Sequence, residues 1–197
     1  MTKEIHALEH KIISSWINNG ASVLDLGCSD GELLSLLIRN NQVHAQGVEL
    51  SEQAIHNCVS AGLSVFQQNI DTGLTEFSDK SLDYVILNQT LQQVKKPDFA
   101  IKEALRVGKK VIVGFPNFCY ITNRLQIFFQ GKVPVTPSLP YEWYDTPNLH
   151  FLSIADFKEY SRKNKITIED TAYIFKNRKI QLLPNLFGEV GLFLLSR

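Results

Sequence analysis

Apolar positions near the start of the chain follow two spacings, one typical of helices and one typical of buried strands. Apolar residues recur at steps of three and four between Ile5 and Trp16, which predicts one apolar helix face, and Gly20 is placed to end that helix. The short apolar run at residues 22–26 predicts a buried strand. Residues 32–39 then predict a second helix.

This alternation continues along the chain and predicts an α/β fold. The further expected elements are a strand at 43–50, a helix at 53–61 with Ser51 as its N-cap, strands at 63–67 and 82–87, a helix at 97–107 and a strand at 110–115. Strands that alternate with helices favour a mostly parallel sheet with helices on both faces. Ligands of such sheets bind beyond the carboxyl ends of the strands.

The alternation breaks after residue 115. Asn117 is expected to cap a helix at 118–130, one face of which can pack on the sheet, and residues 132–150 carry four prolines and predict irregular structure. Ser153 is expected to cap a helix that runs to about residue 163, followed by strands at 166–174 and 190–195. We expect one domain over residues 1–197, with an insert rich in proline and aromatic residues at about 117–150.

Composition narrows the classes of function. Lys plus Arg and Asp plus Glu number 20 each, so the formal net charge is zero and nothing favours binding to nucleic acid or to a membrane surface. No apolar run approaches the ~18 residues of a membrane span, and the N-terminus lacks a signal-peptide pattern, which predicts a cytoplasmic protein. Three cysteines without CxxC spacing predict reduced thiols and no metal site.

The string VLDLGCSDGE at residues 23–32 is the most informative motif. An apolar strand leads to Asp25 and then to Gly27, Ser29 and Gly31 at two-residue steps, followed by a helix whose first N–H groups are free to bind a ligand carboxylate. The third glycine of a dinucleotide-binding G-x-G-x-x-G loop would fall on Glu32, where an acid repels pyrophosphate. The alternative is a tight strand-to-helix turn that binds nothing.

Polar residues follow the next strands too. Glu49 ends the second strand about 20 residues after the loop, where an acid accepts hydrogen bonds from ribose hydroxyls, although a solvated glutamate at a strand end is common. Asn69 follows the third strand and is placed to meet an adenine edge, or else to build a turn. Residues 88–90 follow the fourth strand and either floor the pocket or cap the next helix.

These residues, in this order, resemble the class I S-adenosylmethionine-dependent methyltransferases. NQTLQQVKKPD (88–98), VGFPNF (113–118), VPVTPSLPYEWYDTPNLHFLSI (133–154) and LPNLFGEVGLFLLSR (183–197) resemble segments of the methionine biosynthesis protein MetW family, over almost the whole chain. The resemblance implies a Rossmann-like sheet of seven strands in the order 3-2-1-4-5-7-6, with the seventh antiparallel. It also implies S-adenosylmethionine or S-adenosylhomocysteine as the cofactor. The implied cofactor-binding residues are Asp25, Gly27, Cys28, Ser29, Gly31, Glu49, Leu50, Asn69, Ile70 and Asn88.

Two residues depart from the family pattern. Ser29 stands in place of the middle glycine of the loop, which is tolerable if its φ is negative, and Asn69 stands where an aspartate is expected. No residue is assigned as a catalyst, because methyl transfer can proceed largely by positioning. Four residues are candidates on the acceptor side of the site, each also explicable as structural: Tyr141, Tyr144, Asp145 and His150.

The resemblance implies a role in methionine synthesis as an accessory of a homoserine O-acyltransferase. An independent small-molecule methyltransferase is the alternative, and a nicotinamide-binding Rossmann protein is disfavoured by the glycine spacing. Aromatic residues at 118–129 and Trp143 suggest a surface for a partner protein, with ordinary core packing as the alternative for each residue.

Overall fold

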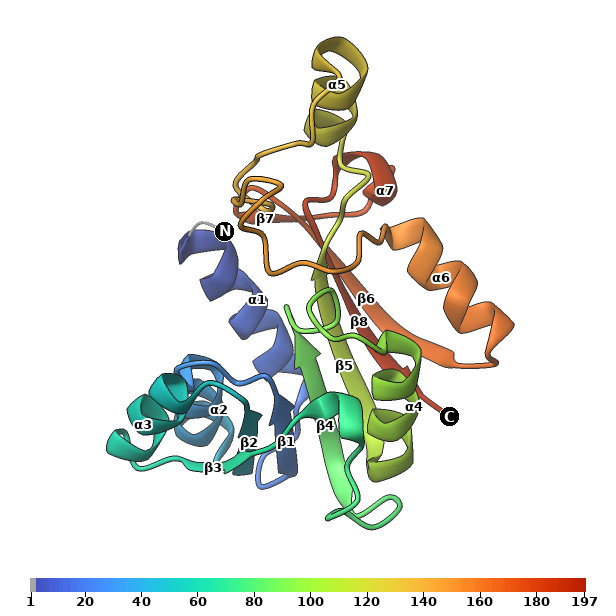
Figure 1. The fold of residues 1–197 in the computed structure, drawn as a ribbon. Coiled ribbons are helices and arrows are strands. Elements are labelled where there is room, and N and C mark those ends of the chain that lie inside the picture. Colours follow the sequence, from blue (N-terminus) through green and yellow to red (C-terminus); the bar gives the residue numbers. More distant parts are fainter. Residues whose placement is uncertain (1–2) are drawn as a thin grey trace.

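The computed structural model describes residues 3–197, and one sheet of eight strands runs through it (Figure 1). The strands are β1 (Ser22–Leu26), β2 (His44–Glu49), β3 (Ser64–Gln67), β4 (Leu82–Asn88), β5 (Gly108–Pro116), β6 (Thr167–Phe175), β7 (Arg178–Ile180) and β8 (Val190–Ser196). The helices are α1 (Lys3–Trp16), α2 (Glu32–Asn41), α3 (Glu52–Ser60), the 3-10 turn η1 (Ile70–Thr72), α4 (Pro97–Val107), α5 (Ile121–Gln130), α6 (Ile154–Lys163) and α7 (Pro184–Phe187).

The strand order is β3-β2-β1-β4-β5-β8-β6-β7. The first five strands pair in parallel, whereas β8 runs antiparallel between β5 and β6. This is the predicted order with one strand added, because β7 folds back on the end of β6 as a short hairpin. The predicted Rossmann-like methyltransferase fold is therefore confirmed, with eight strands in place of seven.

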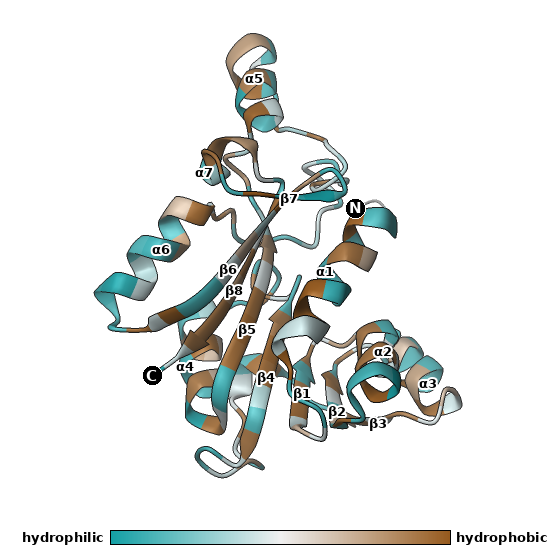
Figure 2. Ribbon diagram, turned by 180° about the vertical axis from the view of Figure 1, so that it is seen from behind, coloured by the Kyte–Doolittle hydropathy of each residue, from teal (hydrophilic) through white to brown (hydrophobic). Residues whose placement is uncertain are grey.

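Helices cover both faces of the sheet, as the alternating pattern predicted. On one face α4 and α6 pack on the strands around Phe115 and Phe193, whose rings stack 5.6 Å apart. On the other face α1 and α2 bury Ile12, Ile13 and Leu37. Figure 2 shows the apolar strands β4, β5 and β8 in the middle of the sheet.

The N-caps of two helices were read correctly from the sequence. The Ser51 hydroxyl accepts a hydrogen bond from the backbone N–H of Ala54. Ser153 and Asp156 form a reciprocal capping box at the start of α6, in which each side chain accepts a hydrogen bond from the other residue's backbone N–H.

The expectation for residues 117–130 was wrong in two respects. The helix begins at Ile121 with Tyr120 as its N-cap, because the Asn117 side chain bonds instead to the backbone around α6 and α7. Moreover α5 does not lay a face on the sheet: Asn123 is its one buried residue, and the helix projects from the top of the molecule in Figure 1. No helix within residues 3–197 is both long and apolar enough to cross a membrane.

Candidate functional site

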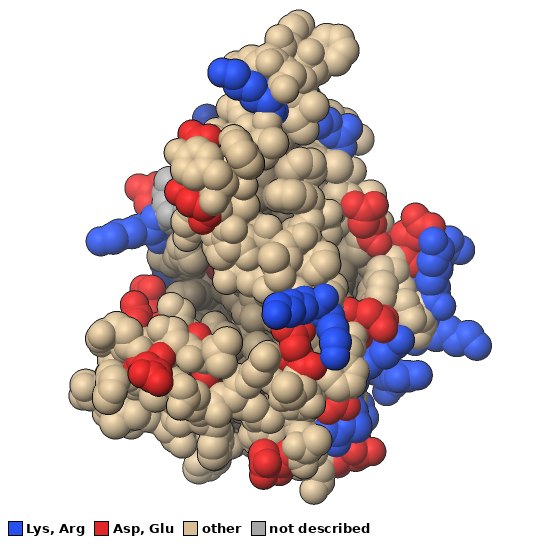
Figure 3. All heavy atoms as spheres, in the orientation of Figure 1, with Lys and Arg blue, Asp and Glu red and all other residues tan. Residues whose placement is uncertain are grey.

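A cavity of about 880 Å³ opens beyond the carboxyl ends of β1, β2 and β4, where the fold rule predicted the site. Figure 3 shows the surface hollowed between the part of the molecule around α3 and the upper part. Its lining comes from the loop after β1, the ends of β2 and β4, α1, and the irregular segment after α5. A cavity of this size suits a ligand as large as a nucleoside.

The loop between β1 and α2 uses left-handed backbone at three alternate residues. Gly27, Ser29 and Gly31 have φ of 78°, 47° and 75°. A Cβ on Gly27 would lie 2.8 Å from Oγ1 of Thr90, and one on Gly31 would lie 2.9 Å from Sγ of Cys58, so both glycines permit close packing. Gly31 is the one predicted cofactor-binding residue outside the cavity lining.

Ser29 does not meet the condition under which a serine was judged tolerable, because its φ is positive. A non-glycine residue in this region carries a backbone cost of ~1 kcal/mol. The surrounding groups hold it there: its N–H donates to Oε2 of Glu49 at 2.9 Å, and its carbonyl accepts from the Cys58 thiol at 3.1 Å. The loop is therefore shaped by its neighbours as well as by its glycines.

Glu49 joins the loop to the end of β2. Besides Ser29 N–H, its carboxylate accepts hydrogen bonds from the N–H groups of Leu50 at 2.7 Å and Ser51 at 3.0 Å. A carboxylate offers about four acceptor positions, so three backbone donors leave capacity for one more. Glu49 lines the cavity, and it can therefore brace the loop and still accept from a ligand.

Asp25 is buried at the base of the cavity, only 3% exposed. Burial, with a smaller contribution from the Glu49 charge, raises its pKa to about 7 from an ordinary value near 3.8. Within residues 3–197 no hydrogen bond to its carboxyl group is formed, although buried carboxylates normally have donors. A cationic or hydrogen-donating ligand would supply what this group lacks.

The residues that follow β2 and β3 present one amide, Asn69, and two apolar side chains, Leu50 and Ile70, to the cavity. Oδ1 of Asn69 accepts the N–H of Asp71 at 2.9 Å, so Asn69 caps the 3-10 turn, which was the alternative expected for it. Its Nδ2 remains a donor. Leu50 is 61% exposed and Ile70 is buried, and both line the cavity. Exposed leucine in a polar pocket is suited to pack on a flat ring.

The end of β4 forms the cavity wall through Asn88, Gln89 and Thr90, as predicted. Behind it lies a group that sequence reasoning missed: Glu9 of α1 is fully buried and accepts from Asn88 Nδ2 and Gln89 Nε2, each at 3.3 Å. Burial raises the pKa of Glu9 to about 7, against the opposing effect of these hydrogen bonds. An acid within the apolar stripe of a helix is the sequence signal that could have revealed it.

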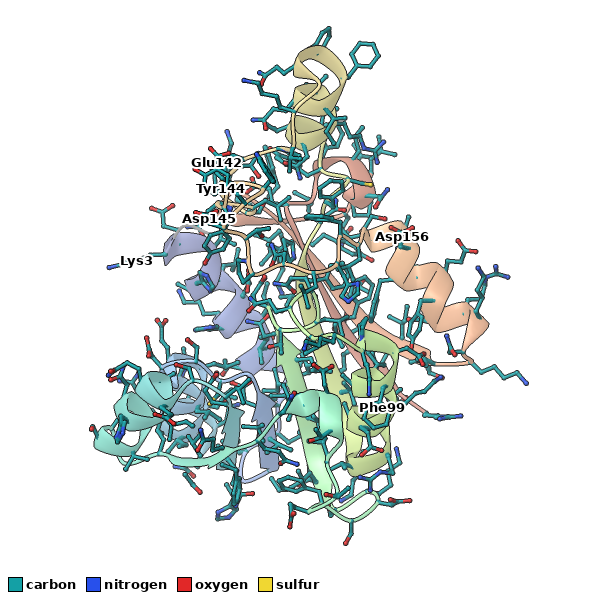
Figure 4. All side chains as sticks on the ribbon, viewed as in Figure 1. Lys3, Phe99, Glu142, Tyr144, Asp145 and Asp156 are labelled. Carbon is teal, nitrogen blue, oxygen red and sulfur yellow. The ribbon has the colours of Figure 1, made fainter. Side chains whose placement is uncertain are left out.

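His6 and His10 of α1 also line the cavity and were not predicted. Burial is the largest cause that lowers the pKa of each, which favours neutral imidazoles. Of the four acceptor-side candidates only Tyr141 lines the cavity, whereas Tyr144 and Asp145 are exposed. Figure 4 shows Glu142, Tyr144 and Asp145 in the segment near the start of α1. His150 lies outside the lining.

In the described part of the chain, the lining of the cavity carries acidic side chains and no strongly basic ones. Its carboxyl groups are Asp25, Asp30, Glu32, Glu49 and Asp71, and no lysine or arginine belongs to the lining formed by residues 3–197. Phosphate groups are normally bound by basic side chains or by free helix N-termini, and acids repel them. The cavity therefore fits a neutral, cationic or zwitterionic ligand, and a dinucleotide poorly. No group of three or more His, Cys, Asp or Glu in this part of the chain is arranged to hold a metal ion.

The sheet order, with an antiparallel strand between β5 and β6, and the cavity at the ends of β1 and β2 define the class I methyltransferase fold. Solved structures agree: a SAM-dependent methyltransferase from Archaeoglobus fulgidus matches with a TM-score of 0.74 and 15% identity, over 100% of this chain and 95% of that one. The complex of the Haloferax volcanii Trm112 methyltransferase activator with a putative methyltransferase matches with a TM-score of 0.72 and 16% identity. The match covers 98% of this chain and 91% of that one.

The sequence identifies the family within that class. The family described as methionine biosynthesis protein MetW matches residues 7–195, and the chain belongs to it. The bifunctional methionine biosynthesis protein MetXA/MetW of Rhodopirellula baltica is 32% identical over 175 residues, which are 84% of this chain. The chain spans only 28% of that relative's length.

Proposed function

We propose that this MetW-family protein binds S-adenosylmethionine or S-adenosylhomocysteine in the cavity and supports the activity of a homoserine O-acyltransferase in methionine synthesis. The observation that carries the cofactor proposal is the buried, unpartnered Asp25 in a cavity lined by five carboxyl groups without a basic side chain. S-adenosylmethionine bears a sulfonium and an ammonium group, and both are attracted by this charge.

The lining residues fit the parts of such a ligand. Asp25 and the loop residues Gly27, Cys28 and Ser29 would face the methionine part, with Gly31 allowing the loop to turn. Glu49 would accept from a ribose hydroxyl with its remaining capacity. Leu50 and Ile70 would pack on the adenine, with Asn69 Nδ2 as a donor at its edge, and Asn88 would close the wall. When bound, S-adenosylmethionine supplies an activated methyl group.

Association with an acyltransferase is supported by the curated relative. Its name joins MetXA and MetW in one bifunctional protein, and this chain matches only about a quarter of it. In that relative the two activities are carried on one chain, and we propose that this chain likewise acts together with a homoserine O-acyltransferase.

An independent small-molecule methyltransferase remains a second candidate. The cavity extends past the proposed cofactor region to His6, His10 and Tyr141, where an acceptor has room. Methyl transfer from radiolabelled S-adenosylmethionine to a defined acceptor, without any partner protein, would support this candidate and count against a purely accessory role.

Thermal unfolding with S-adenosylmethionine tests the cofactor proposal. Ligand at a hundred times its Kd should stabilise the protein by ~2.7 kcal/mol and raise Tm by a few degrees. Excess NAD should leave Tm unchanged. Glu49→Gln should reduce the shift, while Glu159→Gln on the exposed face of α6 should not. The absence of a shift in protein shown to be free of ligand would contradict cofactor binding.

The acyltransferase proposal needs its own measurement. Purified homoserine O-acyltransferase from the same source should turn over faster when this chain is added at equal concentration, and serum albumin serves as the protein control. Equal rates with and without the chain, even when the chain is added in large excess over the acyltransferase, would reject the accessory role and leave the cofactor proposal intact.

A further inference from the structure

Helix α5 and the residues after it form an arm that carries an unusually apolar surface. Its exposed large apolar residues are Leu125, Ile127, Phe128, Phe129, Val133 and Val135, and we call these six residues the arm patch. Phe128 is 81% exposed and Phe129 is 74% exposed, with ring centroids 4.9 Å apart. Leu125, Phe128 and Phe129 are spaced i, i+3 and i+4 and therefore share one helix face.

The arm patch is as large as the largest apolar patches found on monomeric proteins, which are often functional. With ~150–250 Å² per phenylalanine, Phe128 and Phe129 expose roughly 300 Å² between them. That already equals the lower end of the largest apolar patch on a typical monomer, ~300–600 Å². The other four side chains extend it toward the ~800 Å² that each partner contributes to a stable interface.

The arm is held in a defined position despite its exposure. Asn123, the buried residue of α5, donates to the carbonyl of Phe118 at 3.0 Å, and Arg124 Nε donates to the carbonyl of Cys119 at 2.6 Å. The Gln126 side chain exchanges two hydrogen bonds with the backbone of Val135, which ties the chain after α5 back to the helix. A surface ordered before binding loses little conformational entropy on binding.

The charged residues of the arm indicate what kind of partner surface it can meet. α5 contains no acidic residue, and its single basic residue, Arg124, is engaged with the backbone at the base. Figure 3 shows the projecting end free of acidic residues, with basic groups only at its sides. Side chains project from its free end into solvent in Figure 4. The exposed Lys132 lies beside the patch just after α5. The arm thus presents an apolar helix face without acidic residues to an apolar groove that is not basic, the helix-in-groove mode of recognition.

We propose that the arm patch docks into an apolar groove on the homoserine O-acyltransferase. The inference rests on the proposed function, and it adds the surface through which the two proteins meet. The fused relative supports this occupant over a second copy of the chain, because it keeps a MetW unit beside a MetXA unit. The patch also lies apart from the cavity lining, so docking leaves the cofactor cavity free.

The test compares Kd values for purified homoserine O-acyltransferase by isothermal titration calorimetry. The double variant Phe128→Asp/Phe129→Asp should bind at least tenfold more weakly, since aromatic anchors dominate interface energy. Phe128→Leu/Phe129→Leu should lose less. The matched control is Val59→Asp, which places an acid on an exposed apolar position near the end of α3, and it should bind within twofold of the original chain. Circular dichroism and the cofactor-induced Tm shift check that each variant is folded.

Three outcomes distinguish a failure of the docking surface from a failure of the proposed function. If the original chain binds and the double variant binds with the same affinity, the arm patch is not the docking surface, although the acyltransferase is still the partner. If the original chain does not bind the acyltransferase, both the proposed partner and the proposed docking surface are wrong. Light scattering that shows a dimer of the original chain, dissociated only by the double variant, with acyltransferase binding unaltered, would assign the patch to a second copy instead.

Discussion

At the scale of single residues, the site is defined by acids whose environment sets their protonation. Asp25 and Glu9 are both buried, and burial raises the pKa of each to about 7. They lie on the two sides of the cavity wall, Asp25 at the end of β1 and Glu9 behind β4. A ligand that meets Asp25 therefore meets a group that is partly protonated at neutral pH, whose charged form it can stabilise.

Asp25→Asn should change how stability depends on pH. In the original chain the unfolded state loses the Asp25 proton near pH 4, whereas the folded state keeps it until about pH 7. The free energy of unfolding therefore falls as pH rises from about 4 to about 7, and this contribution is absent in the variant. Urea unfolding at several pH values should show the variant gaining stability relative to the original chain across that window.

Asp83→Asn supplies a control of opposite sign. The Lys109 and Ser22 hydrogen bonds lower the pKa of Asp83 to about 2, so its contribution is present above pH 4 and is lost as pH falls toward 2. Asp83→Asn should thus lose stability relative to the original chain above pH 4. A pH-independent difference between Asp25→Asn and the original chain would show that Asp25 does not hold its proton in the folded state.

At the scale of elements, Asn117 connects the end of β5 to three helices. Its Nδ2 donates to the carbonyls of Gly188 and Asn185 at 2.8 and 3.1 Å. Its Oδ1 accepts from the N–H of Cys119 at 3.2 Å. One buried amide therefore positions the starts of α5 and α6 and the end of α7. This is also why it does not cap α5 in the predicted way.

Asn117→Ala should lower the free energy of unfolding by about 2–3 kcal/mol, because it leaves buried carbonyl and N–H groups without partners. The exposed Asn40→Ala on α2 is the control, and its change should stay within about 0.5 kcal/mol. Chemical denaturation monitored by tryptophan fluorescence measures both variants. A loss at Asn117 no larger than that at Asn40 would mean that water replaces these hydrogen bonds.

At the scale of the whole molecule, one continuous segment joins the arm to the cavity. The chain leaves the arm patch at Val135, forms a bridged turn between Thr136 and Leu139, and then lines the cavity at Ser138, Pro140 and Tyr141. A ligand that shifts this segment would also shift the residues that join it to the arm. Cofactor and partner are thus expected to influence each other's binding.

The coupling can be measured from either side. S-adenosylmethionine should change the Kd for the acyltransferase, and the acyltransferase should change the Kd for S-adenosylmethionine by the same factor, ~5-fold or more for a coupling above 1 kcal/mol. Calorimetric titrations in both orders give the two factors. Tyr141→Ala should reduce the coupling more than it reduces partner binding. Identical acyltransferase affinity with and without cofactor would exclude this link.

The sequence by itself determined the parallel half of the sheet and the part of the cavity lining that follows the parallel strands. Short apolar runs bounded by glycine and polar caps form strands wherever they occur, and the carboxyl ends of parallel strands meet at one edge. Asp25, Glu49 and Asn88 therefore come together without further information. Gly27 and Gly31 were recognised because left-handed backbone has a residue preference that is visible in the sequence.

Only the tertiary structure decided the features that depend on contacts between distant segments. The cavity contains His6 and His10 because α1 meets the end of β4, where Asn88 donates to Glu9, and no local pattern records that contact. Ser29 takes a positive φ because Glu49 and Cys58 hold it from two other elements. α5 projects because Asn117 and Asn123 fix its base away from the sheet, although its spacing of apolar residues equals that of a buried helix. Local periodicity specifies an apolar face, and the packing of the rest of the chain decides what covers it.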